Sequence, residues 1–156
     1  MHLHLESDAR IRSVPVFNSS NYSIQHGADS SFIYIADTVN VRMSRRGVID
    51  GNGFQLRSNT PGGGNNKLPR TKGARSVVIE DLYFRDSARW SLHFLFSDDL
   101  LARNVKLVND LRVTTGTLPF VTNTDGFDID ASTFVTVEDS SVYTTDDAFT
   151  PKLTGY

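Results

Sequence analysis

The sequence predicts an all-β chain, because short apolar runs and turn-forming residues alternate along most of its length. Runs rich in Val, Ile, Phe, Tyr and Thr are separated by Gly, Asn, Asp and Ser, and helical stretches are few. A weak internal repeat indicates, in addition, that the strands stack as a solenoid. Periodicity alone does not exclude the alternative, an antiparallel sandwich with similar strand lengths.

The candidate strands follow from the apolar runs in chain order. They are residues 32–35, 39–43, 77–79, 82–84, 92–96, 100–102, 105–108, 127–129, 134–137 and 141–143. The segment 59–72 is rich in Gly, Asn and Pro, and we expect it to be a polar loop that projects from the body.

The internal repeat is centred on Asp81, Asn104 and Asp139. The segments SVVIEDLYF, DLLARNVKL and FVTVEDSSV share an apolar pair, a charged residue, then Asp or Asn, then another strand. The first interval is 23 residues and the second 35, so we expect one coil plus a loop inserted within 109–122. An Asp or Asn at such a turn can hydrogen-bond the neighbouring backbone.

A solenoid makes two testable statements about packing. The last coil, near 150–156, should leave an uncovered edge, because terminal repeats normally need a cap. A set of apolar residues should be buried in stacked parallel rungs: Val77, Ile79, Leu82, Phe84, Val105, Leu107, Val135 and Val137.

The length and bulk composition fit one ordinary domain over 1–156 and exclude several function classes. With 16 Lys plus Arg against 18 Asp plus Glu, the net charge of -2 gives no electrostatic case for nucleic acid or an anionic membrane. The apolar runs are too short for a membrane span. Cysteine is absent, which excludes disulfides and thiolate chemistry. No secretion signal is visible at the N-terminus.

Two acidic clusters are the candidates for chemistry. Asp125 lies in NTDGFDI and the pair Asp146 and Asp147 lies in TDDAF, with 21 residues between Asp125 and Asp146. In a solenoid of that period these carboxylates would lie on adjacent rungs, about 4.8 Å apart. Carboxylates held so close cannot all ionise at their ordinary values, and a proton donor beside an ionised base is what glycosidic cleavage needs.

The motifs resemble glycoside hydrolase family 28, the polygalacturonases and their relatives. The family reads N-T-D-G-I-D-I and then G-D-D-C-I-A-I-K at this separation. Upstream, GVIDGNG at 47–53 resembles its G-x-I-D-G-x-G coil, and RWSLH at 89–93 resembles its W-x-x-H stretch. The similarity runs in order over about 47–152, and ordered multiple matches are far harder to obtain by chance than one motif.

The resemblance implies a right-handed single-stranded parallel β-helix and an inverting hydrolase of pectic polysaccharide that needs no cofactor. Asp146 would be the general acid, and Asp125 and Asp147 would activate the attacking water. Asn123, Trp90 and His93 are the candidate substrate-binding residues. Inversion rests on the resemblance alone, because a separation of one rung would by itself favour retention.

The sequence departs from the family at three places near its second motif. Ala148 replaces the usual Cys, Thr145 stands where Gly or Gln is common, and Thr150 and Pro151 interrupt an apolar strand. The family's later H-G and R-I-K motifs do not occur before Tyr156, so residues 1–156 are expected to be a partial β-helix domain, truncated on its C-terminal side.

Other charged residues are expected to be ordinary surface positions. Asp128 and Asp130 are interpreted as exposed, and Arg42, Arg45 and Arg46 as a solvated face.

Three other functions remain open. A β-helix glucanase of the dextranase and isopullulanase group uses a similar T-D-G and D-D-A pattern, a polysaccharide lyase would use Ca²⁺ and a basic residue, and a non-catalytic β-helix would only bind carbohydrate. The expected partner is a polysaccharide or oligosaccharide, with no nucleic acid or membrane, and the expected location of the parent protein is extracellular or periplasmic.

Overall fold

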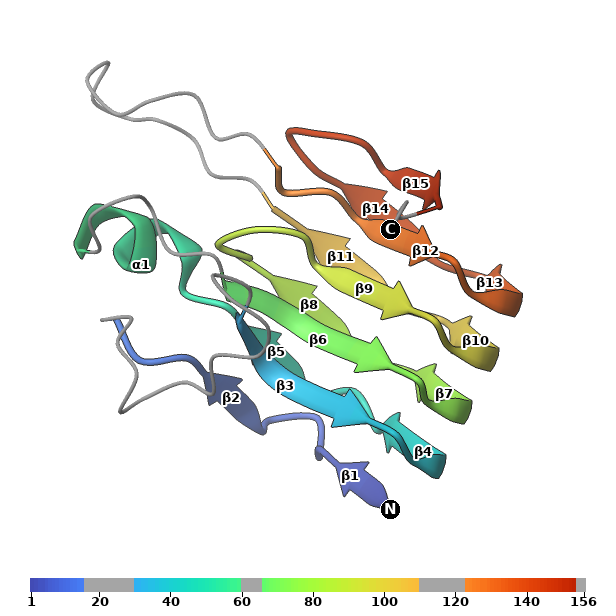
Figure 1. Ribbon diagram of the computed structural model, residues 1–156. Coiled ribbons are helices and arrows are strands. Elements are labelled where there is room, and N and C mark those ends of the chain that lie inside the picture. The colour runs from blue at the N-terminus through green and yellow to red at the C-terminus, as the bar shows by residue number, and fades with distance from the viewer. Residues whose placement is uncertain (16–29, 60–65, 110–122, 154–156) are drawn as a thin grey trace.

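The chain winds into coils, and each coil adds one strand to each of three parallel sheets (Figure 1). The computed structural model describes residues 1–15, 30–59, 66–109 and 123–153. Sheet A contains β1 (His2–His4), β4 (Val39–Ser44), β7 (Arg75–Glu80), β10 (Asp98–Arg103) and β13 (Thr133–Glu138). Sheet B contains β2 (Arg10–Arg12), β5 (Val48–Asp50), β8 (Tyr83–Arg85), β11 (Lys106–Val108) and β14 (Ser141–Tyr143). Sheet C contains β3 (Ser30–Ala36), β6 (Asn66–Lys72), β9 (Leu92–Leu95), β12 (Phe127–Asp130) and β15 (Phe149–Lys152).

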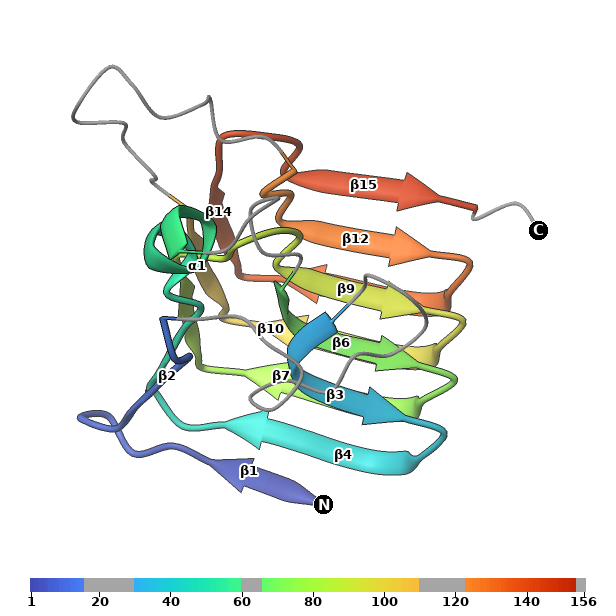
Figure 2. The same ribbon diagram turned by 60° about the vertical axis from the view of Figure 1, so that its left-hand side comes forward.

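The strand register confirms the parallel β-helix and excludes the antiparallel sandwich. Neighbouring strands come from successive coils, as the stack from β3 to β15 shows in Figure 2. Val77 pairs with Leu100 and Leu100 with Val135, which reproduces the intervals of 23 and 35 residues. The additional residues of the longer interval lie between β11 and β12, where the insertion was expected.

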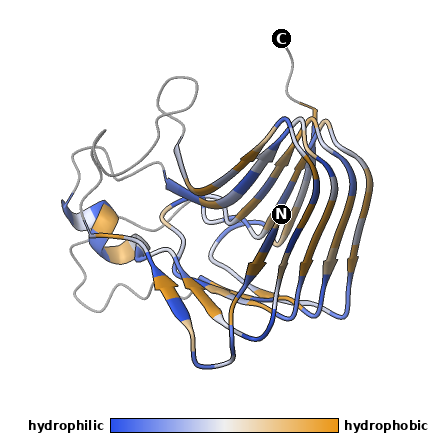
Figure 3. Cartoon of the chain, turned by 90° about the horizontal axis from the view of Figure 1, so that it is seen from below, coloured by the Kyte–Doolittle hydropathy of each residue, from blue (hydrophilic) through white to orange (hydrophobic). Residues whose placement is uncertain are grey.

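The core lies inside the coils and is built from one apolar ladder after another. Figure 3 shows hydrophobic residues along the stacked strands and hydrophilic residues at several turns. Ile49, Phe84 and Leu107 form a buried ladder in sheet B. Six of the residues predicted to be buried are so: Val77, Ile79, Leu82, Phe84, Val105 and Leu107. The prediction was too strong for Val135 and Val137, which are only partly buried because they lie on the last coil.

The turn between sheets A and B has the stacked arrangement that the repeat predicts. Asp81, Asn104 and Asp139 all adopt the left-handed conformation, with φ of 55°, 49° and 50°. Asp and Asn tolerate this conformation better than other non-glycine residues. The Asn104 side-chain amide donates to Asp81 Oδ1 at 2.7 Å, which links consecutive coils.

The connection from sheet B to sheet C differs from the other two because its length varies between coils. It carries the only described helix, α1 (Gly53–Asn59), between β5 and β6, whereas β8 and β9 are separated only by residues 86–91. Turns elsewhere are as short as Asp81 and Leu82 between β7 and β8. We call this connection the B–C corner.

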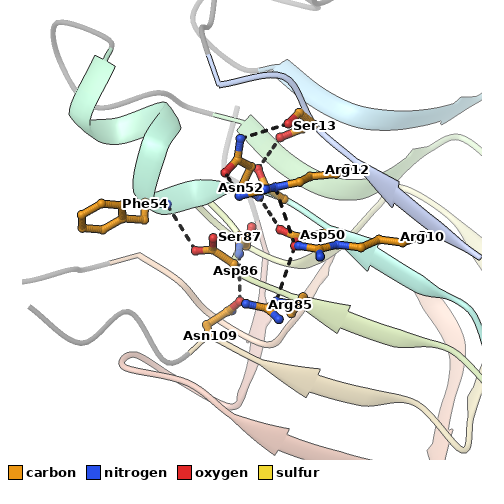
Figure 4. A network of polar contacts seen from close by, with 11 residues as sticks. Arg10, Arg12, Ser13, Asp50, Asn52, Phe54, Arg85, Asp86, Ser87 and Asn109 are labelled. Atoms are coloured by element: carbon orange, nitrogen blue, oxygen red, sulfur yellow. Dashed lines mark hydrogen bonds and ion pairs between the residues drawn. The ribbon is translucent and has the colours of Figure 1, made fainter.

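Buried polar contacts hold the first coils together at the B–C corner (Figure 4). Asp50 bonds Arg10, and the Arg85 Nε atom lies 3.5 Å from Asp50 Oδ2. Asn52 donates to the Ser13 carbonyl at 3.1 Å, and the Phe54 N–H donates to Asp86 Oδ1 at 3.2 Å, which fixes the start of α1. These contacts explain the GVIDGNG segment as a structural element of the second coil.

The prediction of a projecting loop at 59–72 was wrong for its second half. Residues 66–72 form β6, a strand of sheet C that pairs with β3 and β9. Its sequence, NKLPRTK, contains Pro and three cations, which are poor strand predictors. Both Lys67 and Arg70 are nevertheless buried, so polar content did not indicate exposure here. Residues 60–65 lie outside the described part.

The last coil is covered on one side only, as a terminal coil should be. Strands β13, β14 and β15 each pair with one neighbour, and Phe134 is 83% exposed. Three further large apolar residues of this coil are exposed: Tyr143, Phe149 and Leu153. This confirms the predicted edge over residues 150–153, whereas 154–156 lie outside the described part. Among the described helices, none has the length and apolar character needed to cross a membrane.

Candidate active site

The three aspartates predicted to be catalytic meet at the B–C corner. Asp125 lies just before β12, and Asp146 and Asp147 lie in the turn that leads into β15. One carboxylate oxygen from each residue can be chosen so that all lie within 4.8 Å of one another. Asp125 is 6% exposed, whereas Asp146 and Asp147 are exposed to solvent. The corner therefore offers one buried and two accessible carboxylates.

The residues around Asp125 explain why this stretch reads Asn-Thr-Asp-Gly-Phe. Thr124 is buried, and its hydroxyl lies 2.7 Å from that of Thr145 on the next coil. A Cβ atom on Gly126 would lie 2.4 Å from the Ala148 carbonyl oxygen, so only glycine fits. Phe127 fills the core and stacks on Phe149, with ring centroids 5.3 Å apart. Each neighbour of Asp125 thus ties its coil to the following one.

Backbone donors orient the Asp146 carboxylate. The Asn123 N–H donates to Asp146 Oδ2 at 2.6 Å, and the Asp147 N–H donates to Asp146 Oδ1 at 3.0 Å. Asn123 can reach this position because its backbone is left-handed, with φ of 59°, a conformation that Asn tolerates. Asn123 therefore positions one carboxylate of the trio through its main chain.

The environment of Asp125 acts on its protonation in both directions. Burial raises the pKa of Asp125 above its ordinary value, and the nearby Asp146 charge raises it further. Lys152 and the Thr150 hydroxyl, which donates to Asp125 Oδ2 at 3.2 Å, lower it. The balance between these neighbours decides at which pH Asp125 can accept a proton.

Trp90 and His93 lie beside the aspartates on the outer face of sheet C, the face directed away from the core. Trp90 is partly exposed, and its ring centroid lies 4.9 Å from that of His93 in an edge arrangement. His93 is buried, and its Nε2 atom lies 3.4 Å from Asp130 Oδ2. Burial, with the charges of Lys67 and Arg70, lowers the pKa of His93 to about 3, so the ring is neutral at physiological pH.

Asp128 and Asp130 are buried, and their interpretation as ordinary exposed positions was wrong. They alternate with core residues along β12 and so point outward, but the outer face of sheet C is not open to solvent there. Asp128 is 0% exposed and contacts the Lys152 ammonium. Burial raises the pKa of Asp128 to about 7, and Asp125 adds to the rise.

Lys152 is a residue near the site to which the sequence reasoning gave no role. Its Nζ atom lies 3.9 Å from Asp125 Oδ2 and 3.8 Å from the centroid of the Trp90 ring. The signal was present, because Asp128 and Lys152 both match letters of the two family motifs. By contrast, Arg42, Arg45 and Arg46 are exposed as expected, and Arg42 bonds Glu80.

Comparison with known proteins identifies the family of the chain. The profile of the family described as glycosyl hydrolases family 28 matches residues 4–151. The chain belongs to this family. Its match begins well before residue 47, where the motif resemblance began, and takes in the first coil. Among curated proteins, none is found that matches the chain.

Two solved structures show the same fold. A candidate glycosyl hydrolase from Parabacteroides merdae superposes with a TM-score of 0.62 at 16% identity, over 97% of this chain and 70% of that one. The endo-xylogalacturonan hydrolase from Aspergillus tubingensis gives a TM-score of 0.69 at 21% identity, over 96% of this chain and 43% of that one. The family 28 chain described here thus spans less than half the length of the Aspergillus enzyme.

Proposed function

We propose that the protein is a polygalacturonase-like glycoside hydrolase that cleaves pectic polysaccharide. The observation that carries the proposal is the meeting of Asp125, Asp146 and Asp147, whose carboxylate oxygens come within 4.8 Å. Family membership supports glycosidase chemistry, and the similarity to a xylogalacturonan hydrolase supports a pectic substrate.

In the proposed mechanism, the exposed Asp146 donates a proton to the leaving glycosidic oxygen. Asp125 and Asp147 take a proton from the attacking water as it adds to the anomeric carbon. This division suits the burial of the three side chains, since the acid must reach the substrate and a base can act through a water. No metal or cofactor takes part in these steps.

The substrate-binding roles follow the exposure of the predicted residues. Asn123 and Trp90 reach solvent, so they can contact a sugar, and an indole ring suits the apolar face of a pyranose. His93 is buried against the edge of Trp90, so we assign it the support of that ring. A polymeric substrate that cannot enter a cell agrees with an extracellular or periplasmic location.

The stereochemical outcome is a separate part of the proposal. The family resemblance implies inversion, whereas carboxyls nearer than about 5.5 Å are typical of retaining enzymes and inverting ones hold them about 6.5–9.5 Å apart. We propose inversion with the water held between Asp125 and Asp147. Proton NMR of the first-formed anomer tests this directly, and a product of retained configuration would contradict it.

The activity is tested by release of reducing ends from polygalacturonate, xylogalacturonan and dextran, with Asp146→Asn and Asp139→Asn as paired variants. Asp139 is a turn residue of the A–B connection and serves as the matched control. We expect pectic substrates to be cleaved and Asp146→Asn alone to abolish cleavage. Cleavage of dextran only indicates the glucanase, an unsaturated ultraviolet-absorbing product lost on chelation indicates a lyase, and binding without cleavage indicates a non-catalytic protein.

A further inference from the structure

Lys152 occupies the space between Asp128, Asp125 and Trp90. It extends from β15 on the outer face of sheet C, and its side chain is 24% exposed. Its ammonium contacts Asp128, lies 3.9 Å from Asp125 Oδ2, and lies 3.8 Å from the centroid of the Trp90 ring. One cation on the coil of β15 therefore contacts two carboxyl groups on the coil of β12 and an indole on the coil of β9.

Other groups facing this cluster do not replace that contact. The exposed Asp146 and Asp147 are carboxylates, and Thr150 offers Asp125 a hydroxyl. Around Trp90, Lys67 and Arg89 lie 4.8 and 5.2 Å from the ring centroid, and His93 is in an edge arrangement with the ring. Of the groups named here, Lys152 is the one that forms ion pairs with both Asp125 and Asp128.

We propose that Lys152 is a positioning residue for Asp125: held by Asp128 and Trp90, its ammonium stabilises the Asp125 carboxylate as an anion in a nearly buried position. The inference rests on the proposed function, because it explains how Asp125 stays able to accept a proton beside Asp146. Asp128 is the anchor in this arrangement. It is fully buried and contacts the ammonium directly, so it fixes the cation in place.

The alternative is that Lys152 only neutralises Asp128 and stabilises the fold. The structural role and the positioning role predict different titrations of the Asp125 carboxyl group when Lys152 is replaced. A purely structural lysine would change stability and leave the titration of Asp125 where it was. A positioning lysine would move that titration, because removing a cation at 3.9 Å raises the pKa of a carboxyl group.

The experiment follows the Asp125 carboxyl carbon by NMR in protein labelled with ¹³C at aspartate, for the wild type and four variants. Lys152→Met should move the Asp125 titration to higher pH, and Lys152→Arg, which keeps the charge, should restore it. Asp128→Asn should leave the Asp125 titration nearly in place, because burial keeps Asp128 protonated up to about pH 7 and the amide carries no charge either. The double variant Lys152→Met with Asp128→Asn should therefore titrate like Lys152→Met alone.

The pH profile of kcat/KM on polygalacturonate supplies the second readout. Lys152→Met should lower kcat/KM about tenfold on the acid limb and much less above neutral pH, as expected for a base that protonates at higher pH. Emission from Trp90, the sole tryptophan, reports whether each variant keeps the ring in its native surroundings.

The outcomes separate this inference from the proposed function. An Asp125 titration that Lys152→Met leaves unmoved in folded protein overturns the positioning role. If that variant does not fold, Lys152→Gln takes its place, and an unmoved Asp125 titration in that variant overturns the role equally. A wild type that cleaves no substrate while its Asp125 titration still responds to Lys152 removes the proposed catalysis and leaves the positioning role standing.

Discussion

At the scale of single residues, the outer face of sheet C holds ionisable groups whose burial shifts their protonation in opposite directions. Asp128 has a pKa raised to about 7 and His93 one lowered to about 3, and desolvation is the first cause of both shifts. Both groups therefore favour their neutral forms in the folded state. Their effects on stability have opposite signs as pH changes.

Asp128→Asn should make the protein lose stability on acidification more steeply than the wild type does. Between about pH 4 and 7 the folded state keeps a proton on Asp128 that the unfolded chain releases, so this group's contribution falls as pH rises. Removing it should add about 2–4 kcal/mol near pH 7 and little at pH 4. Urea unfolding at a series of pH values measures this, with the exposed Asp99→Asn as control.

His93→Gln should produce the opposite change. Below about pH 6.5 the unfolded chain binds a proton that buried His93 refuses, so wild-type stability falls as pH drops from there toward 3. The variant should lose this dependence and gain relative stability near pH 4. His2→Gln, at the exposed first residue of β1, is the matched comparison. Equal slopes for the wild type and His93→Gln would contradict the assignment of His93 as buried and neutral.

The catalytic assignment makes its own prediction for the three aspartates. Asp146→Asn should lower kcat on polygalacturonate by about 10²–10⁴-fold with a much smaller change in KM, because the amide keeps the shape but cannot deliver a proton. Asp125→Asn and Asp147→Asn should do likewise by failing to activate water. Double variants should lose little more than single ones, since the three act on one transition state. Fully additive losses would show that they do not act together.

At the scale of elements, each strand is short and gains its stability from the rungs above and below it. Gly126 marks the point where β12 and the turn before β15 approach most closely. Its missing Cβ leaves room for the Ala148 carbonyl and the Val142 side chain. That contact helps to hold Asp125, the residue before Gly126, at its distance from Asp146 and Asp147.

Gly126→Ala should therefore destabilise the protein by about 2 kcal/mol or more, because the new methyl group meets backbone that cannot move aside. Gly73→Ala is the matched comparison. Gly73 has a φ of 60°, and its new methyl group would meet the flexible Asp37 side chain, so about 1–2 kcal/mol is expected. Thermal unfolding of both variants gives the ranking, and a larger loss at Gly73 would contradict it.

Whether a strand could be predicted from the sequence depends on what its outward-facing side chains contact. Strands with a run of apolar residues at their centre, such as β7 and β10, were predicted within a few residues. The strand β6 was not predicted, because residues such as Lys67 and Arg70 are typical of exposed loops. They are buried here only because neighbouring coils lie on both sides of β6. Asp128 was wrongly interpreted as exposed for the same reason. The alternation of residues along β12 shows that its side chain points outward, but not that neighbouring groups cover it. The three motif aspartates were brought together as predicted, whereas Lys152 needs three-dimensional proximity to be recognised.

At the scale of the whole molecule, no strand of the described residues covers the outer edge of the last coil. Phe134 and Leu153 are more than four-fifths exposed there, and β13, β14 and β15 each pair with one described strand only. Strand edges with apolar neighbours are templates for association with other chains.

The 156-residue chain should accordingly self-associate as its concentration rises. Phe134→Asn combined with Leu153→Lys should weaken this association, because Asn accepts the left-handed backbone at 134 and Lys charges the edge. Val39→Lys changes an exposed apolar residue of the second coil and should have little effect. Sedimentation velocity over a concentration series is the measurement, and a strict monomer for the unmodified chain would show that this edge does not mediate association.

The unequal turns of the coil also bear on how such a protein can change over evolutionary time. Each described C–A connection has two residues, and the A–B connections shorten from five residues in the first coil to two from the third coil on. Left-handed residues such as Asp81 and Asn104 lock the short A–B turns in register. Insertions and deletions can therefore accumulate at the B–C corner without disturbing the apolar ladders. Because Asp125, Asp146 and Asp147 lie at that same corner, the frame can stay constant while new lengths of chain there alter which branched sugars reach the carboxylates.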